Sequence, residues 1–94
     1  MSELKFEWDP AKAAFSWGKH GVSFKEAQTV FDDPQLKREY DVKHAVVEDR
    51  WLVIGFSQRL RLISVAFTKR HETIRIISAR RATKAESGRY AQSL

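Results

Sequence analysis

The feature that most restricts the fold is a series of three apolar segments in the second half of the chain, separated by short polar turns. Each segment is rich in Val, Ile, Leu and aromatic residues, which favour extended structure. The connections at 57–59 and 69–71 are too short to contain a helix, so the segments are expected to be consecutive antiparallel strands. A weaker segment at 36–40 could add another strand, and a polar loop is expected at 41–49. The three segments cover residues 50–56, 61–68 and 73–79.

Helix signals occupy the first third of the chain. Asp9 and Pro10 suit the N-cap and the first helical position, and Lys19-His20-Gly21 is a typical helix end. Ser23 and Glu26 then form a capping box that begins a second helix, which Asp32-Asp33-Pro34 ends. Two short helices joined by so tight a turn predict a helical hairpin. The expected apolar stripe of the first helix is Ala11, Ala14, Phe15, Trp17 and Gly18, and that of the second is Phe24, Ala27, Val30 and Phe31.

Two further elements complete the expected order. Residues 5–8 alternate polar and apolar side chains and predict a short strand, and Thr83 with Glu86 forms a capping box for a C-terminal helix. The sequence therefore predicts an α+β fold, in which the N-terminal helical hairpin packs on one face of an antiparallel sheet. A length of 94 residues fits a single domain covering residues 1–94.

Composition excludes several classes of protein. The chain has no cysteine, which removes disulfides and thiolate metal sites. The N-terminus does not resemble a signal peptide, and no apolar run is long enough to cross a bilayer. We therefore expect a cytoplasmic protein with no membrane partner.

The charge is unevenly distributed along the chain. Residues 1–49 contain seven Lys or Arg and ten Asp or Glu, a net charge of −3. Residues 50–94 contain ten Lys or Arg and two Asp or Glu, a net charge of +8, and eight of those ten basic residues are Arg. Because guanidinium binds phosphate oxygens in a bidentate way, this half of the chain favours a nucleic-acid partner.

Arginines gather around the last predicted strand. Arg80 and Arg81 lie at its exit, and they point to opposite faces unless the strand ends before them. Both are candidate catalytic residues. Side chains elsewhere on the strands, at the turns and on the last helix are candidates for RNA binding. These candidates are Arg59, Arg61, Lys69, Arg70, His71 and Tyr90.

An array of arginines is suited to RNA cleavage without a metal ion. The RNA 2′-hydroxyl can supply the nucleophile, and arginine can stabilise the charge of the phosphorane that forms. Glu72 is the only acid between Asp49 and Glu86, so it is a candidate general base, with His71 as the alternative. Glu72 could equally form only an ion pair with an arginine across the hairpin. Both interpretations remain open on the residues alone.

No motif indicates a metal or a cofactor. The four glycines are scattered, so they form no phosphate-binding loop, and no His or carboxylate cluster has metal-ligand spacing. Asp32 and Asp33 are expected to end a helix, and His20 is expected to have a structural role at a helix end. We therefore expect an enzyme that needs no cofactor.

Four segments, read together, resemble the BrnT family of type II toxins, whose partners are the BrnA antitoxins. They are FEWDPAK at 6–12, KHGVSFxEA at 19–27, VFDDP at 30–34 and RIISARRATxxE at 75–86. The resemblance extends over nearly the whole chain, in order and at the expected spacing. The stretch from Gln35 to Asp49 matches no motif of the family.

The resemblance carries implications that composition could not supply. It implies a RelE-like fold with helices on one side of the sheet, and a ribonuclease that arrests translation. It implies an antitoxin that masks the toxin, with promoter DNA bound only through the antitoxin in the complex. Arg80 and Arg81 match the family's Arg-Arg pair, whereas Glu72 and Arg70 match its charged hairpin.

Two other functions remain open. The same arginines could belong to a nucleic-acid-binding module with no enzymatic activity, or to a toxin of the RelE or ParE fold that acts on a protein. If Arg80 and Arg81 are exposed catalytic residues, then truncating either one should change stability little.

Overall fold

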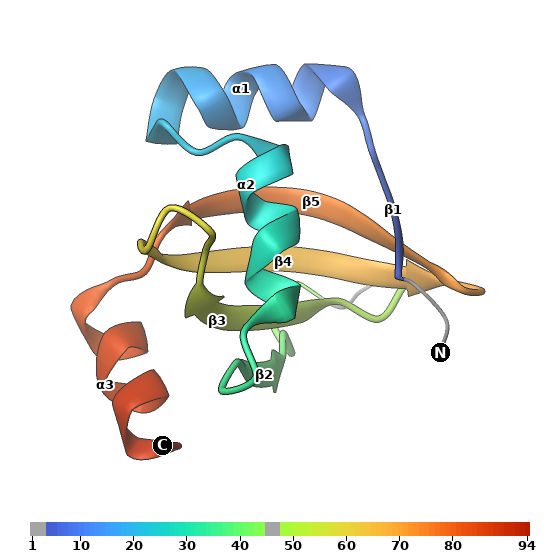
Figure 1. Cartoon of the computed structure of the whole chain (residues 1–94). Coiled ribbons are helices and arrows are strands. Elements are labelled where there is room, and N and C mark those ends of the chain that lie inside the picture. The colour runs from blue at the N-terminus through green and yellow to red at the C-terminus, as the bar shows by residue number, and fades with distance from the viewer. Residues whose placement is uncertain (1–3, 45–47) are drawn as a thin grey trace.

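The computed structural model describes residues 4–44 and 48–94. Over these residues the chain forms a mixed α+β fold, which confirms the predicted class (Figure 1). Within these described ranges, no helix is long and apolar enough to span a membrane. The elements are β1 (Lys5–Trp8), α1 (Pro10–His20), α2 (Phe24–Thr29), a 3-10 turn η1 (Val30–Asp32), β2 (Lys37–Tyr40), β3 (Trp51–Phe56), β4 (Leu62–Arg70), β5 (Thr73–Arg81) and α3 (Lys84–Gln92).

The sheet has the strand order β1-β5-β4-β3-β2. Strands β2 to β5 form the predicted antiparallel meander, but β1 pairs with β5 in parallel, from Lys5 opposite Thr73 to Trp8 opposite Ile76. The prediction of a purely antiparallel sheet was therefore wrong at this edge. The reason is that β1 and β5 are far apart in sequence, so the intervening elements can return the chain in either direction.

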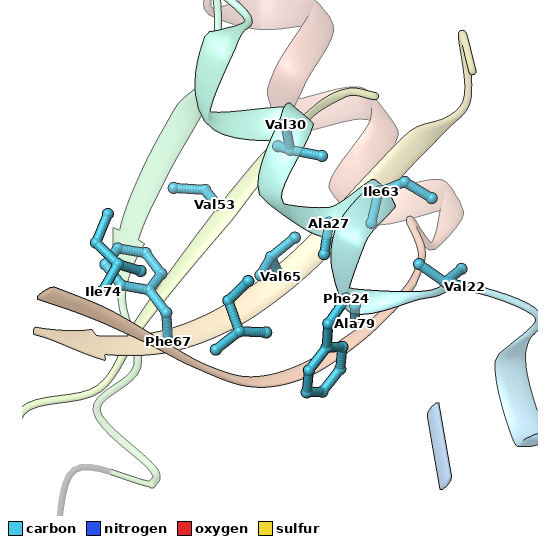
Figure 2. Close-up of a cluster of buried hydrophobic side chains, with 11 residues drawn as sticks. Val22, Phe24, Ala27, Val30, Val53, Ile63, Val65, Phe67, Ile74 and Ala79 are labelled. Atoms are coloured by element: carbon cyan, nitrogen blue, oxygen red, sulfur yellow. The ribbon is translucent and has the colours of Figure 1, made fainter. Parts of the chain in front are cut away.

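The hydrophobic core lies on one face of the sheet, beneath α2. Figure 2 shows Phe24 and Ala27 of α2, and Val30 of the following turn η1, directed toward side chains of the strands. The ring of Phe31 packs edge-to-face between Phe6 and Phe67, with centroid separations of 5.2 and 5.1 Å. The predicted apolar face of the second helix is thus confirmed. The buried strand residues of this core are Val53, Ile63, Val65, Phe67, Ile74, Ile76 and Ala79.

Helix α1 packs against the sheet with a different face from the one that the sequence predicts. Its buried residue is Ser16, whose hydroxyl oxygen lies 2.9 Å from the Val22 carbonyl oxygen and 2.8 Å from that of Ala79. The predicted stripe is wrong because α1 lies beside β5 and packs there through Ser16 and the half-buried Ala13, while α2 crosses β5 and β4 (Figure 1). The structure does not confirm a hairpin that covers the sheet as one unit. All five residues of the predicted stripe are instead exposed, namely Ala11, Ala14, Phe15, Trp17 and Gly18.

Helix α3 packs on the face of the sheet opposite α2. It covers Ile54, which is fully buried although its neighbours Val53 and Gly55 point to the α2 side. Tyr90 of α3 packs edge-to-face against Phe56, with ring centroids 5.6 Å apart. The expectation of helices on one side of the sheet was therefore wrong, and α3 leaves only part of the second face open.

Candidate active site

A hollow of about 290 Å³ lies on the part of the second sheet face that α3 leaves open. We call this part the open face. Three strands contribute to the hollow, together with the two ends of the connection between β2 and β3. Two arginines, one histidine and one aspartate surround small side chains. The lining residues are Asp41, His44, Arg50, Leu52, Ser64, Ala66, Ser78 and Arg80.

Strand alternation and side-chain size explain why the hollow forms. Leu52 pairs with Ala66, and Ala66 pairs with Ser78, so these three side chains form a row across β3, β4 and β5. Ser64 pairs with Arg80 in the next row. Because serine and alanine fill little volume, the sheet is recessed between the arginines. The recess places polar groups beside a surface that a backbone phosphate could approach.

Arg80 is held in place by a buried carboxylate. Its Nη1 and Nη2 donate to Oε1 and Oε2 of Glu86 at 2.7 and 2.9 Å. Glu86 also accepts from the backbone N of Thr83 at 2.8 Å, which closes the predicted capping box. Burial by itself would raise the pKa of Glu86, but the bonds from Arg80 and Thr83 outweigh it and hold the pKa at about 2. The Glu86 carboxylate in turn raises the pKa of Arg80, so both groups stay charged.

Arg50 and His44 enter the hollow from the ends of the β2–β3 connection. The Asp41 backbone N donates to the Arg50 carbonyl at 2.8 Å, which extends the β2–β3 ladder by one pair. His44 Nδ1 lies 3.1 and 3.0 Å from the two carboxylate oxygens of Asp41. A proton on Nδ1 satisfies this contact and leaves Nε2 as the proton acceptor. The His44 side chain is 63% exposed, so a substrate can reach it.

The structure separates the three predicted catalytic residues. Arg80 lines the hollow, whereas Arg81 is exposed on the other face of β5 as strand alternation requires. Glu72 lies in the turn before β5, eight residues from Arg80 along an extended strand, which corresponds to roughly 26 Å. Glu72 and Arg80 therefore do not meet in one site.

The predicted RNA-binding arginines of the β3–β4 turn have another partner. Arg61 is ion-paired with Glu26 and donates through Nη2 to the Gly21 carbonyl at 3.0 Å. The Glu26 side chain is 4% exposed, and the Arg61 hydrogen bond holds its pKa below the ordinary value. Arg59 is 62% exposed and lies 3.8 Å from the same carboxylate. Arg61 thus links the turn to α2, and Arg59 remains accessible to an anion.

The remaining predicted RNA-binding residues fall into two groups. Lys69, Arg70 and His71 are exposed at the β4–β5 turn, away from the hollow. Tyr90, in contrast, is only 6% exposed, and its hydroxyl donates to Asp33 Oδ2 at 2.7 Å. Burial and this hydrogen bond raise the pKa of Tyr90 to about 12. Its predicted role in RNA binding does not agree with this burial, since no base can stack on a covered ring.

Sequence reasoning did not single out Asp41, His44 or Arg50. They lie in or beside a polar loop with no motif, so only the strand register could have shown that they reach the open face. Two features of the sequence could have indicated the site. Arg50 lies two residues before Leu52 and so shares its face of the strand, and the small residues Ser64 and Ser78 leave space on the neighbouring strands. Within residues 4–44 and 48–94, no three His, Asp or Glu side chains gather as metal ligands.

The Arg80–Glu86 pair leads to a prediction about stability. Arg80→Ala leaves a buried carboxylate without its main partner and should cost about 2 kcal/mol. Arg81→Ala removes an exposed side chain and should change the free energy of unfolding by less than about 0.5 kcal/mol. Urea denaturation of the two variants measures both values. The predicted difference between the variants replaces the expectation that both truncations change stability little. Equal stability of the two variants would contradict the structural role of Arg80.

The same pair predicts how stability depends on acidity. The pKa of Glu86 in the folded state lies below its ordinary value of 4.5, so its contribution is present above pH 4.5 and is lost as the pH falls toward 2. The full loss corresponds to about 3 kcal/mol. Glu86→Gln keeps the helix cap but has no charge to lose. Denaturation curves should therefore show the wild type losing more stability than the variant over this pH range, and parallel losses would show that Glu86 is not the cause.

Comparison with known proteins agrees with the fold. A family model described as "Ribonuclease toxin, BrnT, of type II toxin-antitoxin system" matches residues 8–86. The crystal structure of the Brucella abortus ribonuclease toxin BrnT is similar, with a TM-score of 0.68 and 25% sequence identity. This match covers 87% of the present chain and 100% of the Brucella chain. No match was found among curated proteins. The chain therefore belongs to the BrnT family of ribonuclease toxins of type II toxin–antitoxin systems.

Proposed function

We propose that this toxin cleaves RNA on the open face of the sheet, without a metal ion, by attack of the RNA 2′-hydroxyl. The observation that carries the proposal is a His–Asp pair in one hollow with two arginines. A phosphate bound between Arg50 and Arg80 would lie beside His44. The proposed roles are proton acceptor for His44 and anion stabilisers for the arginines.

The proposed reaction balances without any further reagent. The 2′-hydroxyl proton passes to His44 Nε2 while the 2′-oxygen bonds to phosphorus. The bond from phosphorus to the 5′-oxygen then breaks, and that oxygen takes up a proton from solvent. The products are a 2′,3′-cyclic phosphate and a 5′-hydroxyl. Asp41 orients the imidazole through its contact with Nδ1, as a carboxylate does in other histidine pairs.

Glu86 prepares Arg80 for this role. The carboxylate occupies one side of the guanidinium, through Nη1 and Nη2. Arg80 Nε makes no hydrogen bond to the part of the chain that the structure describes, and the side chain is 38% exposed. An RNA phosphate can therefore bind the remaining donors while Arg80 stays fixed. A guanidinium fixed in advance loses less entropy when it binds the transition state.

Membership in a type II family implies a protein antitoxin as partner. We propose that an acidic segment of this antitoxin covers the open face, because the charge of Arg50 and Arg80 would attract it and its presence would exclude RNA. Arrest of translation would follow from loss of RNA. Binding of promoter DNA would come only through the antitoxin.

The proposal predicts which histidine matters. Purified toxin should cleave naked RNA in the presence of EDTA, and His44→Gln should lower the cleavage rate by about 10²- to 10⁴-fold, since glutamine cannot accept the proton. His71→Gln and Glu72→Gln are matched controls at the β4–β5 turn and should leave the rate unchanged. Gel-based cleavage of a labelled RNA gives all four rates.

Several outcomes would overturn the proposal. Loss of wild-type activity in EDTA with recovery on adding Mg²⁺ would show that a metal ion is needed. Full activity of His44→Gln together with an inactive Glu72→Gln would return the general base to the β4–β5 turn. Absence of RNA cleavage at every salt concentration would favour a protein target.

A further inference from the structure

A second hollow of about 400 Å³ lies between α1 and the end of β5. It adjoins the candidate active site, because Arg50 and Ser78 line both hollows. Its volume is within the range of small-ligand pockets. The catalytic roles proposed above do not use it. The lining residues are Ala11, Lys12, Phe15, Ser16, His20, Arg50, Ile77 and Ser78.

An irregularity in β5 creates one wall of this hollow. Ala66 pairs with Ser78 and Phe67 pairs with Ile76, so Ile77 is an extra residue without a partner on β4. Strand β1 ends opposite Ile76, which leaves the following edge of β5 open to α1. The bulge therefore leaves Ile77 and Ser78 as successive residues between the buried Ile76 and Ala79, and both line the hollow.

The opposite wall contains the exposed aromatic face of α1. Phe15 is 63% exposed, and the Lys19 ammonium lies 5.4 Å from its ring centroid. The lining thus combines apolar surface with the cations Lys12 and Arg50, and among the residues that the structure describes it includes no carboxylate. A flat apolar group that is attached to a phosphate fits this combination.

We propose that the second hollow binds a nucleobase of the RNA, next to the phosphate that is cleaved, by stacking on Phe15. The proposal rests on the proposed function, because the shared Arg50 and Ser78 join the base site to the catalytic hollow. Stacking on Phe15 tolerates any base, since every base has a π-face. Lys12 and Arg50 hold the flanking phosphates. The subsite anchors the strand so that its 2′-hydroxyl reaches His44.

The chain offers a matched control on the same helix. Trp17 is 57% exposed and lies two residues from Phe15, about 200° around α1, and it does not line the hollow. Phe15→Ala and Trp17→Ala each remove one exposed aromatic ring. Equal melting temperatures for the two variants would establish that both fold.

The experiment measures cleavage of a short single-stranded RNA in EDTA by the wild type and both variants. Loss of one stacked base should raise KM about tenfold for Phe15→Ala, with kcat nearly unchanged because stacking holds substrate and transition state alike. Trp17→Ala should behave as the wild type. An abasic residue at one position beside the cleaved bond should weaken the wild type by a similar factor and have little further effect on Phe15→Ala.

An unchanged KM for Phe15→Ala would overturn the base subsite while leaving the proposed function intact. If Phe15→Ala instead weakens binding of the antitoxin with no effect on RNA, the hollow is a protein-docking surface and the proposal is wrong. Binding of a 2′-O-methyl RNA, which cannot be cleaved, tests the base subsite separately from the proposed cleavage activity. Weaker binding by Phe15→Ala than by Trp17→Ala supports the subsite even if wild-type cleavage fails, and equal binding by both contradicts it.

Discussion

The carboxylate of Glu86 connects the C-terminal helix to the sheet. It accepts hydrogen bonds from the Thr83 backbone N and from both terminal nitrogens of Arg80, and it lies 3.3 Å from the Ser64 hydroxyl. A buried carboxylate is costly unless each oxygen is hydrogen-bonded, so the position of α3 and the position of Arg80 depend on each other. One interaction therefore both fixes the helix and orients the arginine that the proposed chemistry requires.

The two faces of the sheet divide structure from function. Beneath α2, large apolar side chains pack into a core (Figure 2). On the open face, the strands carry small side chains at Ser64, Ala66 and Ser78, and charged side chains surround them. Arg61 and Glu26 form a second buried ion pair, but theirs joins the β3–β4 turn to α2. The two ion-paired arginines thus have different partners, since Arg61 binds Glu26 of α2 and Arg80 binds Glu86 of α3.

Local signals in the sequence were reliable. The N-caps Ser23 and Thr83 were predicted correctly, since all the atoms involved lie within four residues. The capping box at Thr83 is complete, whereas at Ser23 the Glu26 carboxylate binds Ser57 and Arg61 instead of closing the box. The meander was predicted from its short turns. The parallel pairing of β1 was not, because it depends on contacts between residues nearly 70 positions apart. The exposed stripe of α1 was misjudged for a related reason: helical spacing identifies an apolar face but not whether the protein covers it.

The candidate site depends even more on distant contacts. Arg80 was named from the sequence because arginine suits phosphate binding whatever the fold, but its pairing with Glu86 depends on the turn between β5 and α3. His44 sits in a loop without a motif, and its link to Asp41 becomes meaningful only when β4 and β5 place serines beside it. Glu72 precedes β5 and Arg80 lies near its other end, a separation that depends on the strand being extended and that no local motif reveals.

The central claim is that the toxin uses the RNA's own 2′-hydroxyl as the nucleophile on the open face. End-group analysis of the cleaved RNA tests this claim most directly, by mass spectrometry of the two fragments. The account predicts a 2′,3′-cyclic phosphate on one fragment, a 5′-hydroxyl on the other, and no cleavage where a 2′-deoxynucleotide precedes the bond. A 5′-phosphate with a 3′-hydroxyl, or normal cleavage after the deoxynucleotide, would contradict it.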